Sequence, residues 1–382
     1  MKIVAMGGGT GLSALLHGLK KYVRDEWDDE WNDERDNERD NATPFPAAPL
    51  RPEPVRLSDL TAVVTVSDDG GSSGRLRREF QVLPPGDIRN CMVALSEDEG
   101  LLSRLFQFRF PSGKGLKGHS FGNLFLTALT GITGDFQDAV KVTSEVLAIR
   151  GRILPSTVSN VTLEAVMQNG RIVRGETLIS RSRARIARIR LVPARCHPLP
   201  QTLEAIDEAD AITVGPGSLF TSLIPNLLVQ GVAERMARAP AARIFICNLM
   251  SQPGETIGYS AADHIRAIYD HCGLPVFDYA LLNTNPASPG LRRRYLSQRS
   301  KPVEVDAAEL EKLGVRLVTG NLLSEERTGA STAQKVRHHS DRLAKKVLAI
   351  ALRHRNLARK AGGVPSRLGA GRLLRKRRLA RT

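Results

Sequence analysis

Short apolar runs alternate along the chain with segments in which leucines recur at helical spacing. The first run, Lys2 to Met6, leads into Gly7-Gly8-Gly9-Thr10-Gly11, and apolar residues then follow at helical spacing: Leu12, Leu15, Leu16 and Leu19. This order predicts a strand, a glycine loop and a helix. The run Leu60 to Val66 is rich in β-branched residues and predicts a second buried strand.

The second half of the chain repeats this alternation. Ala211 to Val214 predicts a strand, Gly215 to Ser218 a second glycine loop, and the residues after it a helix to about Arg238. Further apolar runs predict strands at 243–248, 276–281 and 316–318. Periodic segments predict helices at 90–95, 120–129 and 135–148, and an amphipathic helix at 333–352 closes the domain.

The period changes between residues 151 and 195. Val161 to Val166 and Ile172-Val173 flank Asn169-Gly170, a dipeptide typical of hairpin turns, so this region predicts an antiparallel excursion. Residues 1–354 therefore predict one α/β domain. We expect a Rossmann-like, doubly wound, mostly parallel sheet with an inserted antiparallel hairpin region.

Two segments depart from ordinary globular composition. Residues 24–56 form an acidic, Pro-rich insert, in which Arg24 to Asp40 contains ten acidic residues and three arginines. Residues 355–382 form a basic tail. From Lys335 to Thr382 the sequence contains sixteen Lys and Arg residues, and its one acidic residue is Asp341. Polar segments of this kind bury too little apolar surface to fold alone, so we expect both to be disordered.

The rest of the sequence excludes several classes of protein. No stretch approaches the roughly 18 apolar residues of a membrane span, and the chain opens directly into a strand pattern, so we expect a cytoplasmic protein without a signal peptide. The four cysteines form no C-x-x-C pair and predict buried free thiols. No aromatic residue interrupts the basic run Arg375 to Arg378, so nucleic acid is not the expected partner.

The two glycine loops are the strongest candidates for anion binding. A loop that ends a strand and opens a helix offers backbone N–H groups and the positive end of the helix to a phosphate. The first loop, Gly8-Gly9-Thr10-Gly11, has Leu12 where G-x-G-x-x-G requires glycine, and no Lys-Ser/Thr follows, so an NAD dehydrogenase or a P-loop enzyme is weakly supported. The second loop contains Gly215, Gly217 and Ser218. Together the loops could hold a diphosphate, although tight turns without a ligand remain open.

Acidic residues follow the second predicted strand. Asp68 and Asp69 lie at its carboxyl end, where doubly wound folds bind ligands, and Asp87 lies in the next loop. Since Mg²⁺ in proteins is often held by one or two carboxylates plus substrate oxygens, Asp69 and Asp87 are candidate metal ligands. The alternative for Asp68 and Asp69 is a turn or a helix cap before Gly70-Gly71.

Four further polar residues each have a structural explanation beside a functional one. Asn226 follows the second loop on its helix and could be an ordinary core hydrogen-bonding residue. Arg337, placed on the closing helix, could reach a phosphate or lie on a solvated face. His119 and Asn123 lie beside a helix start, and no nucleophile stands at the spacing of a catalytic triad.

These motifs, as an ordered set, resemble the YvcK (GlmR) family of gluconeogenesis factors within the CofD-like group of 2-phospho-L-lactate transferases. The resemblance covers nearly all of residues 2–352 and is carried by Gly7 to Leu12, Val66 to Arg75, Pro85 to Asn90, Gly118 to Asn123 and Gly215 to Leu219. It implies a Rossmann-like cytoplasmic protein that binds UDP-sugars, notably UDP-N-acetylglucosamine. It also implies a role in cell-wall precursor supply and cell shape during growth on gluconeogenic carbon sources, with a protein partner in precursor synthesis.

The resemblance also implies residue roles. Thr10, Asn226 and Arg337 match positions associated with nucleotide-sugar binding. Pro85 to Arg89 reads Pro-Gly-Asp-Ile-Arg where the transferases carry a Pro-Asp-x-Asp-type segment, which weakens the expectation of the transferase reaction. The predicted nucleotide- and phosphate-binding residues are Gly8, Gly9, Thr10, Gly11, Asp68, Asp69, Gly70, Ser72, Ser73, Arg75, Gly215, Gly217, Ser218, Asn226 and Arg337.

Two functions follow as hypotheses. The preferred one is a nucleotide-sugar-binding regulator, in which the loops hold the diphosphate of a UDP-sugar, with NAD as the other nucleotide to consider. The alternative is a Mg²⁺-dependent phospho- or nucleotidyltransferase, in which Asp69 and Asp87 hold the metal while Arg75 or Arg89 neutralises phosphate charge. A homo-oligomer is compatible with either function.

Overall fold

The computed structural model describes residues 1–23, 55–97, 100–182, 184–327 and 334–360. Nearly all of the predicted acidic insert, and the basic tail beyond residue 360, lie outside these residues. No helix among the described residues is long and apolar enough to cross a membrane.

A seven-stranded sheet forms the centre of the molecule, and every neighbouring pair of its strands is parallel. Its strands are β1 Lys2–Gly7, β2 Asp59–Val64, β3 Arg152–Pro155, β7 Ala211–Val214, β8 Ala242–Ile246, β9 Tyr279–Asn283 and β10 Arg316–Gly320. β1 and β7 are buried almost along their whole length, as strands covered on both faces must be, which explains their uninterrupted apolar runs.

The strand order is β10-β9-β8-β7-β1-β2-β3. From β1 the chain proceeds outward through β2 to β3, whereas from β7 it proceeds in the opposite direction through β8 and β9 to β10. The order therefore reverses between β1 and β7, and the loops that follow these two strands diverge to opposite faces of the sheet. In open α/β sheets ligands bind at such a switch point, beyond the carboxyl ends of the strands.

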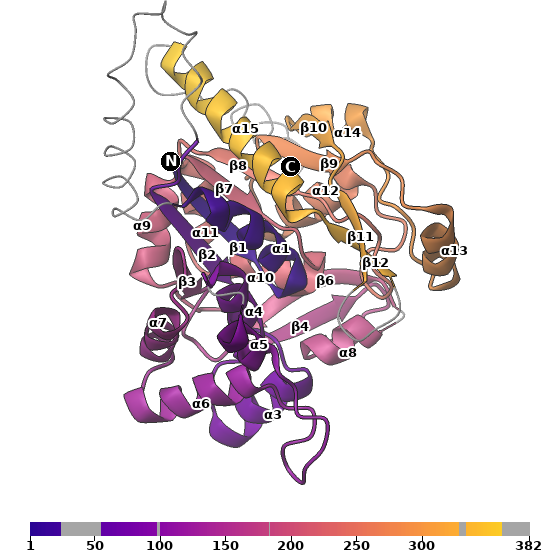
Figure 1. Cartoon of the computed structure of the whole chain (residues 1–382). Helices are drawn as coiled ribbons and strands as arrows, with labels where there is room; N and C mark the ends of the chain where they lie inside the picture. Colours follow the sequence, from indigo (N-terminus) through magenta and orange to yellow (C-terminus); the bar gives the residue numbers. More distant parts are fainter. Residues whose placement is uncertain (24–54, 98–99, 183, 328–333, 361–382) are drawn as a thin grey trace, which may run out of the picture.

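Helices cover both faces of the sheet, as the doubly wound prediction requires. Helices α1 and α15 pack together in front of it in Figure 1, and α10, α11 and α12 lie behind it. The front layer consists of α1 Gly9–Leu19, α4 Gly86–Leu95 and α15 Ser340–Lys360, and the back layer of α9 Pro200–Glu208, α10 Ile224–Leu228, α11 Val232–Arg238 and α12 Ala261–Cys272.

The remaining helices flank this core. They are α3 Gly71–Phe80, α5 Leu101–Gln107, α6 Phe121–Thr133, α7 Phe136–Val146, α8 Glu176–Arg181, α13 Pro289–Ser297 and α14 Ala307–Lys312. The helix predicted to run to Arg238 is interrupted: a wide turn at Leu219–Leu223 precedes α10, and Gly231, with φ of +81°, begins α11.

The antiparallel excursion is confirmed. β4 Thr162–Met167 pairs with β5 Ile172–Arg174 across the Asn169-Gly170 turn and with β6 Ile186–Val192 on its other side.

The closing helix was predicted from residue 333, and its beginning was wrong. Gln334–His338 instead forms strand β12, which pairs with β11 Leu323–Arg327, and α15 starts only at Ser340. β-Pairing across this short ribbon overrides the helical spacing of the sequence. Arg337 is therefore a strand residue, and its place in the crevice is set by the ribbon.

Candidate functional site

The two glycine loops lie in contact at the switch point. A Cβ atom on Gly11 would lie 2.3 Å from the carbonyl oxygen of Pro216, so only glycine allows this approach. Gly9 has a φ of +63°, in the left-handed region that favours glycine, and α1 begins there. The backbone of the first loop thus turns sharply from β1 into a helix whose N-terminus faces the second loop.

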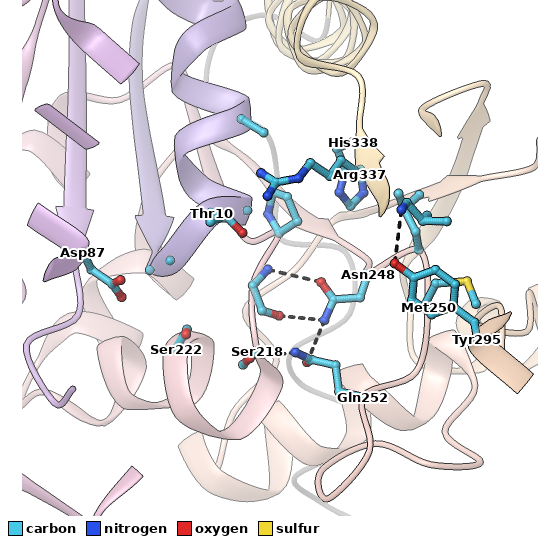
Figure 2. Close-up of a pocket in the computed structure, with 18 of the residues that line it drawn as sticks. Thr10, Asp87, Ser218, Ser222, Asn248, Met250, Gln252, Tyr295, Arg337 and His338 are labelled. Carbon is cyan, nitrogen blue, oxygen red and sulfur yellow. Dashed lines mark hydrogen bonds between the residues drawn. The ribbon is translucent and has the colours of Figure 1, made fainter. Parts of the chain in front are cut away.

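A cavity of about 370 Å³ opens over these loops. Figure 2 shows Thr10 and Ser218 on one cavity, with Asp87 at one end and Tyr295 and Met250 at the other. The lining residues come from seven separate segments: Gly8, Gly9, Thr10, Gly11, Ala14, Asp87, Glu176, Pro216, Gly217, Ser218, Ser222, Asn248, Leu249, Met250, Gln252, Tyr295, Val336, Arg337 and His338. Eight of the residues singled out by sequence are among them.

Asn226 acts beneath the loops and does not line the cavity. Its side chain is fully buried, and its Nδ2 donates to the carbonyl oxygens of Gly7, at 3.1 Å, and Ser222, at 2.7 Å. Gly7 is the last residue of β1, and Ser222 belongs to the wide turn after the second loop. Asn226 therefore fastens the two loops to one another, which is a positioning role.

The second loop is held from its other side by two amide side chains that the sequence did not single out. Asn248 Nδ2 donates to the carbonyl oxygen of Gly217 at 2.7 Å, and Asn248 Oδ1 accepts from the N–H of Gly217 at 3.2 Å. Gln252 Nε2 donates to Ser218 Oγ at 2.8 Å. In the sequence, the one indication that Asn248 and Gln252 lie at the cavity is their position at and just after the end of the strand predicted at 243–248.

Carboxyl groups gather at one end of the cavity. Asp87 is half-buried beside Gly8, and its carboxylate accepts a hydrogen bond from the backbone of Gly9. Burial, with the nearby charge of Asp68, raises the pKa of Asp87 to about 6. Burial, reinforced chiefly by Asp68 and Asp87, raises the pKa of Glu176 to about 9, so Glu176 is a neutral hydrogen-bond donor at pH 7.

Asp69 is placed differently from Asp87. Its Oδ1 accepts from the backbone N–H of Thr177 at 2.9 Å and from the Thr177 hydroxyl at 2.7 Å, at the start of α8. Asp69 thus binds the first turn of α8, and not the helix after Gly70-Gly71 that the sequence offered as the alternative. Asp68 Oδ1 accepts from the N–H of Gly70 at 2.8 Å, the turn alternative, and burial raises the pKa of Asp68.

These bonds bear on the predicted metal ligands. Asp87 faces the cavity, whereas Asp69 Oδ1 is already occupied at α8. In the described part of the chain, no group of three or more His, Cys, Asp or Glu side chains is arranged to hold a metal ion. A Mg²⁺ ion here would therefore depend on Asp87 and on oxygens of a bound substrate.

The segment Gly70 to Arg75, predicted to bind nucleotide or phosphate, forms the start of α3. Gly70 precedes the helix, Ser72 and Ser73 are buried in it, and none of these residues lines the cavity. Ser72 Oγ lies 3.1 Å from His119 Nδ1, and Arg75 donates to the carbonyl oxygen of Lys117 at 2.9 Å. These contacts hold the segment around His119 against α3, which accounts for its polar residues without a catalytic role.

The β11–β12 ribbon closes the cavity from the side opposite the loops. In Figure 2 the Arg337 side chain extends toward Thr10. Its neighbour His338 is half-buried, with Nε2 3.2 Å from the carbonyl oxygen of Cys247, and desolvation lowers the pKa of His338 to about 4. Tyr295 of α13 accepts a hydrogen bond from the N–H of Val336 at 3.1 Å. The two neighbours of Arg337 in β12, Val336 and His338, are thus each held by a hydrogen bond, and these bonds fix the strand that positions the Arg337 guanidinium.

Comparison with known proteins gives a consistent result. A family model described as 2-phospho-L-lactate transferase CofD matches residues 3–323. A gluconeogenesis factor of Bacillus subtilis is 44% identical over 323 residues, which cover 85% of this chain and 91% of the relative. One from Halalkalibacterium halodurans is 42% identical over 346 residues, covering 91% and 95%. A relative from Nostoc sp. is 48% identical over 348 residues, covering 91% of this chain and 68% of its own.

A solved structure is similar as well. A crystal structure of a Bacillus halodurans protein, described as a member of the UPF0052 family, superposes with a TM-score of 0.78 at 42% identity. The match covers 91% of this chain and 98% of that one. The α/β fold is therefore shared with that protein over 91% of this chain.

Proposed function

The chain belongs to the CofD family, and from this membership and the crevice we propose that it is a nucleotide-sugar-binding regulatory protein. Its ligand is of the UDP-N-acetylglucosamine type, and its role is that of a gluconeogenesis factor needed for cell-wall precursor supply and cell shape. The names of its relatives support the gluconeogenic role. The ligand rests on the chemistry of the crevice.

One observation carries the proposal. Two glycine loops meet at the switch point of the sheet, on one cavity that the Arg337 guanidinium enters. Backbone N–H groups at a helix N-terminus favour phosphate, and an arginine can pair with two phosphate oxygens at once. Two loops side by side match the two phosphates of a diphosphate better than a single phosphate.

The carboxyl end of the cavity suits the sugar. Neutral Glu176 and the Asp87 carboxyl can hydrogen-bond to sugar hydroxyl or amide groups beyond the second phosphate. Because the lining residues come from separate segments, a ligand that bridges them would favour one arrangement of these segments over others. A regulator needs such a difference in affinity between two states, whether free or partner-bound.

Calorimetric titration of the full chain with UDP-N-acetylglucosamine tests the proposal, with NAD as the comparison nucleotide. We expect saturable heat and a raised melting temperature with the UDP-sugar and neither with NAD. Absence of both signals at millimolar UDP-sugar would rule out the ligand class.

Arg337→Ala gives the same experiment a residue-level test. Loss of a charge-assisted hydrogen bond should weaken UDP-N-acetylglucosamine by roughly 1.5–3 kcal/mol, or about ten- to a hundredfold. The matched control is Lys335→Ala, which removes an equal charge from an exposed side chain of the same strand outside the cavity. Equal losses in both variants would show that net charge alone is responsible.

The alternative is a Mg²⁺-dependent phospho- or nucleotidyltransferase, favoured by the family description and by Asp87 at the cavity. It predicts that product forms from a nucleotide substrate only when Mg²⁺ is present, and that Asp87→Asn abolishes turnover. The regulator instead predicts nucleotide-sugar binding that persists with EDTA and in Asp87→Asn. Product formation and nucleotide-sugar binding, each measured with and without Mg²⁺, therefore separate the two functions.

A further inference from the structure

A second cavity, of about 240 Å³, lies beside the first at the carboxyl ends of β8 and β9. Asn248 and Leu249 line both cavities, so the second begins where the first ends. It lies at the end away from Asp87 and Glu176, which are absent from its lining. Its lining residues are Cys247, Asn248, Leu249, Leu282, Asn283, Thr284, Asn285, Pro286, Arg292, Pro302 and Val303.

Helix α13 belongs to both cavities. Tyr295 lines the first and Arg292 lines the second, and residues three apart lie on one side of a helix. A ligand whose phosphates lie on the glycine loops could therefore extend past Asn248 along one continuous side of α13.

Some polar side chains of the second cavity are already hydrogen-bonded within the protein, and others are available to a ligand. Asn283 Oδ1 accepts from the N–H of Leu322 at 2.9 Å, and its Nδ2 donates to the carbonyl oxygen of Asn285 at 2.6 Å. Asn248 is likewise committed to Gly217. By contrast, the side chains of Asn285 and Arg292 are exposed and make no hydrogen bond or ion pair with any residue of the described chain.

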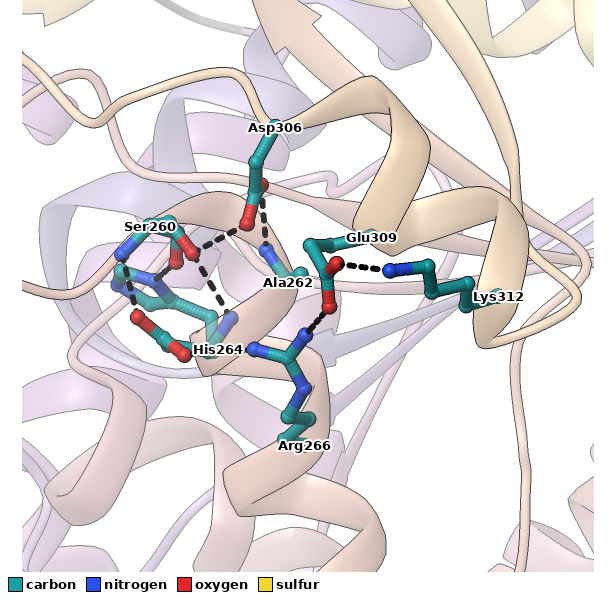
Figure 3. Close-up of polar contacts among 8 residues, drawn as sticks. Ser260, Ala262, His264, Arg266, Asp306, Glu309 and Lys312 are labelled. Carbon is teal, nitrogen blue, oxygen red and sulfur yellow. Dashed lines mark hydrogen bonds and ion pairs between the residues drawn. The ribbon is translucent and has the colours of Figure 1, made fainter.

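One wall of the cavity is firmly held. Pro302 and Val303 belong to a strand-like segment that pairs with Met250 and leads to Asp306. Asp306 accepts from Ser260 Oγ at 2.6 Å and from the N–H of Ala262 at 3.0 Å, at the start of α12 (Figure 3). This wall is thus anchored to the back layer before any ligand arrives.

The same anchorage continues along α12. Arg266 pairs with Asp263 and Glu309, and Lys312 donates to Glu309 at 2.6 Å, so α14 is fixed beside α12 as well (Figure 3).

We infer that this second cavity receives the nucleobase of the bound nucleotide; the inference rests on the proposed function. The apolar walls formed by Leu249, Leu282 and Pro302 suit the faces of a planar ring. The free amide of Asn285 and the Thr284 hydroxyl supply polar contacts for its edge, and the Arg292 guanidinium can stack on its face.

The sugar is the other group that could occupy the cavity, and the lining argues against it. No carboxyl group is among the residues that line the second cavity, whereas Asp87 and Glu176 line the first at its far end. A nucleotide-sugar has a base at one end and a sugar at the other, with the diphosphate between them. The glycine loops lie between the carboxyl end and the second cavity, so the order of the groups fits.

Calorimetry with UDP, ADP and inorganic pyrophosphate on the full chain tests the inference. UDP should bind more tightly than pyrophosphate, and Arg292→Ala should weaken UDP by about tenfold while changing pyrophosphate by less than about twofold. The control is Arg293→Ala, the adjacent exposed arginine, which lines neither cavity and should leave both affinities unchanged. Asn285→Ala should alter the ratio of UDP to ADP affinity.

The outcomes separate two failures. If UDP binds no more tightly than pyrophosphate, or if Arg292→Ala weakens both ligands equally, the nucleobase assignment is wrong while the phosphate site stands. An effect of Arg293→Ala equal to that of Arg292→Ala would also overturn it, because net charge would then explain the result. If neither UDP nor pyrophosphate binds, the proposed function itself fails.

Discussion

Gly11 has no room for a side chain, because a Cβ atom there would meet the backbone of Pro216. Gly11→Ala should separate the loops, destabilise the fold by about 1–3 kcal/mol and abolish measurable UDP-N-acetylglucosamine binding. Gly131→Ala is the control, since a Cβ atom added to Gly131 on α6 would have no atom within 4 Å, and it should stabilise by about 0.5–1 kcal/mol. Urea unfolding and calorimetry measure both effects. Unimpaired binding by Gly11→Ala would contradict the loop contact.

The two half-buried carboxyl groups of the cavity, Asp87 and Glu176, make stability depend on pH in a defined direction. The pKa of Glu176 is about 9 in the folded protein, compared with an ordinary value of 4.5 for an unfolded chain. Between these two pH values the folded protein therefore retains a proton that the unfolded chain releases. The free energy of unfolding therefore falls as pH rises between these values. In Glu176→Gln, the free energy of unfolding should no longer show the decrease that Glu176 causes. In Asp87→Asn, a smaller decrease should disappear, and it should be confined to pH values below about 6, the folded pKa of Asp87.

Urea unfolding of the three proteins at pH values from about 5 to 9 checks this expectation. Parallel curves for Glu176→Gln and the parent chain would mean that Glu176 is ionised in the folded protein.

Individual cavity residues were predictable only where the motif itself faces the cavity. Thr10, Gly217 and Ser218 follow strands directly, so strand ends locate them at the cavity. Asp69 could not be assigned, because its partner Thr177 lies in the antiparallel excursion, far away in sequence. Glu176 was missed for the same reason: nothing local to it shows that α8 would approach the glycine loops.

At the scale of elements, Asn226 links β1 to the turn that follows β7. Asn226→Ala should leave the buried carbonyl of Ser222 without this donor and cost about 1–3 kcal/mol of stability, with a parallel loss of ligand affinity. Thr202→Val on α9 is the control, because the buried Thr202 hydroxyl has no partner among the described residues, so an apolar replacement of the same shape should be nearly neutral. Chemical unfolding of both variants gives the comparison, and a neutral Asn226→Ala would refute the linking role.

Some elements are determined by the local sequence pattern, and others only by pairing with a distant segment. β1, β7 and the Asn169-Gly170 hairpin follow from short-range patterns, because buried parallel strands and hairpin turns have local signatures. β12 does not, since Gln334–His338 carries helical spacing and becomes a strand only against β11. The position of Arg337 in the crevice depends on that pairing, which is why its role was ambiguous in the sequence.

At the scale of the molecule, the described residues that flank the acidic insert lie at the amino ends of the parallel strands, opposite the crevice. Val23 pairs with Leu57, and the N–H of Leu57 donates to the carbonyl oxygen of Tyr22 at 2.7 Å, just before β2 begins. Replacing residues 26–53 by a Gly-Ser linker of about six residues should therefore leave stability and UDP-N-acetylglucosamine affinity unchanged. Thermal unfolding and calorimetry test this, and a loss of binding would implicate the insert in the site.

The crevice joins the first turn of α1, the loop after β7 and the late ribbon strand β12. During synthesis on the ribosome, the nascent chain exposes the first of these almost at once and the last only near its end. A chain that ends before β12 lacks one of the groups that would bind the ligand. Nucleotide binding would accordingly require a chain that extends through β12, and products truncated before that strand would not compete for the nucleotide.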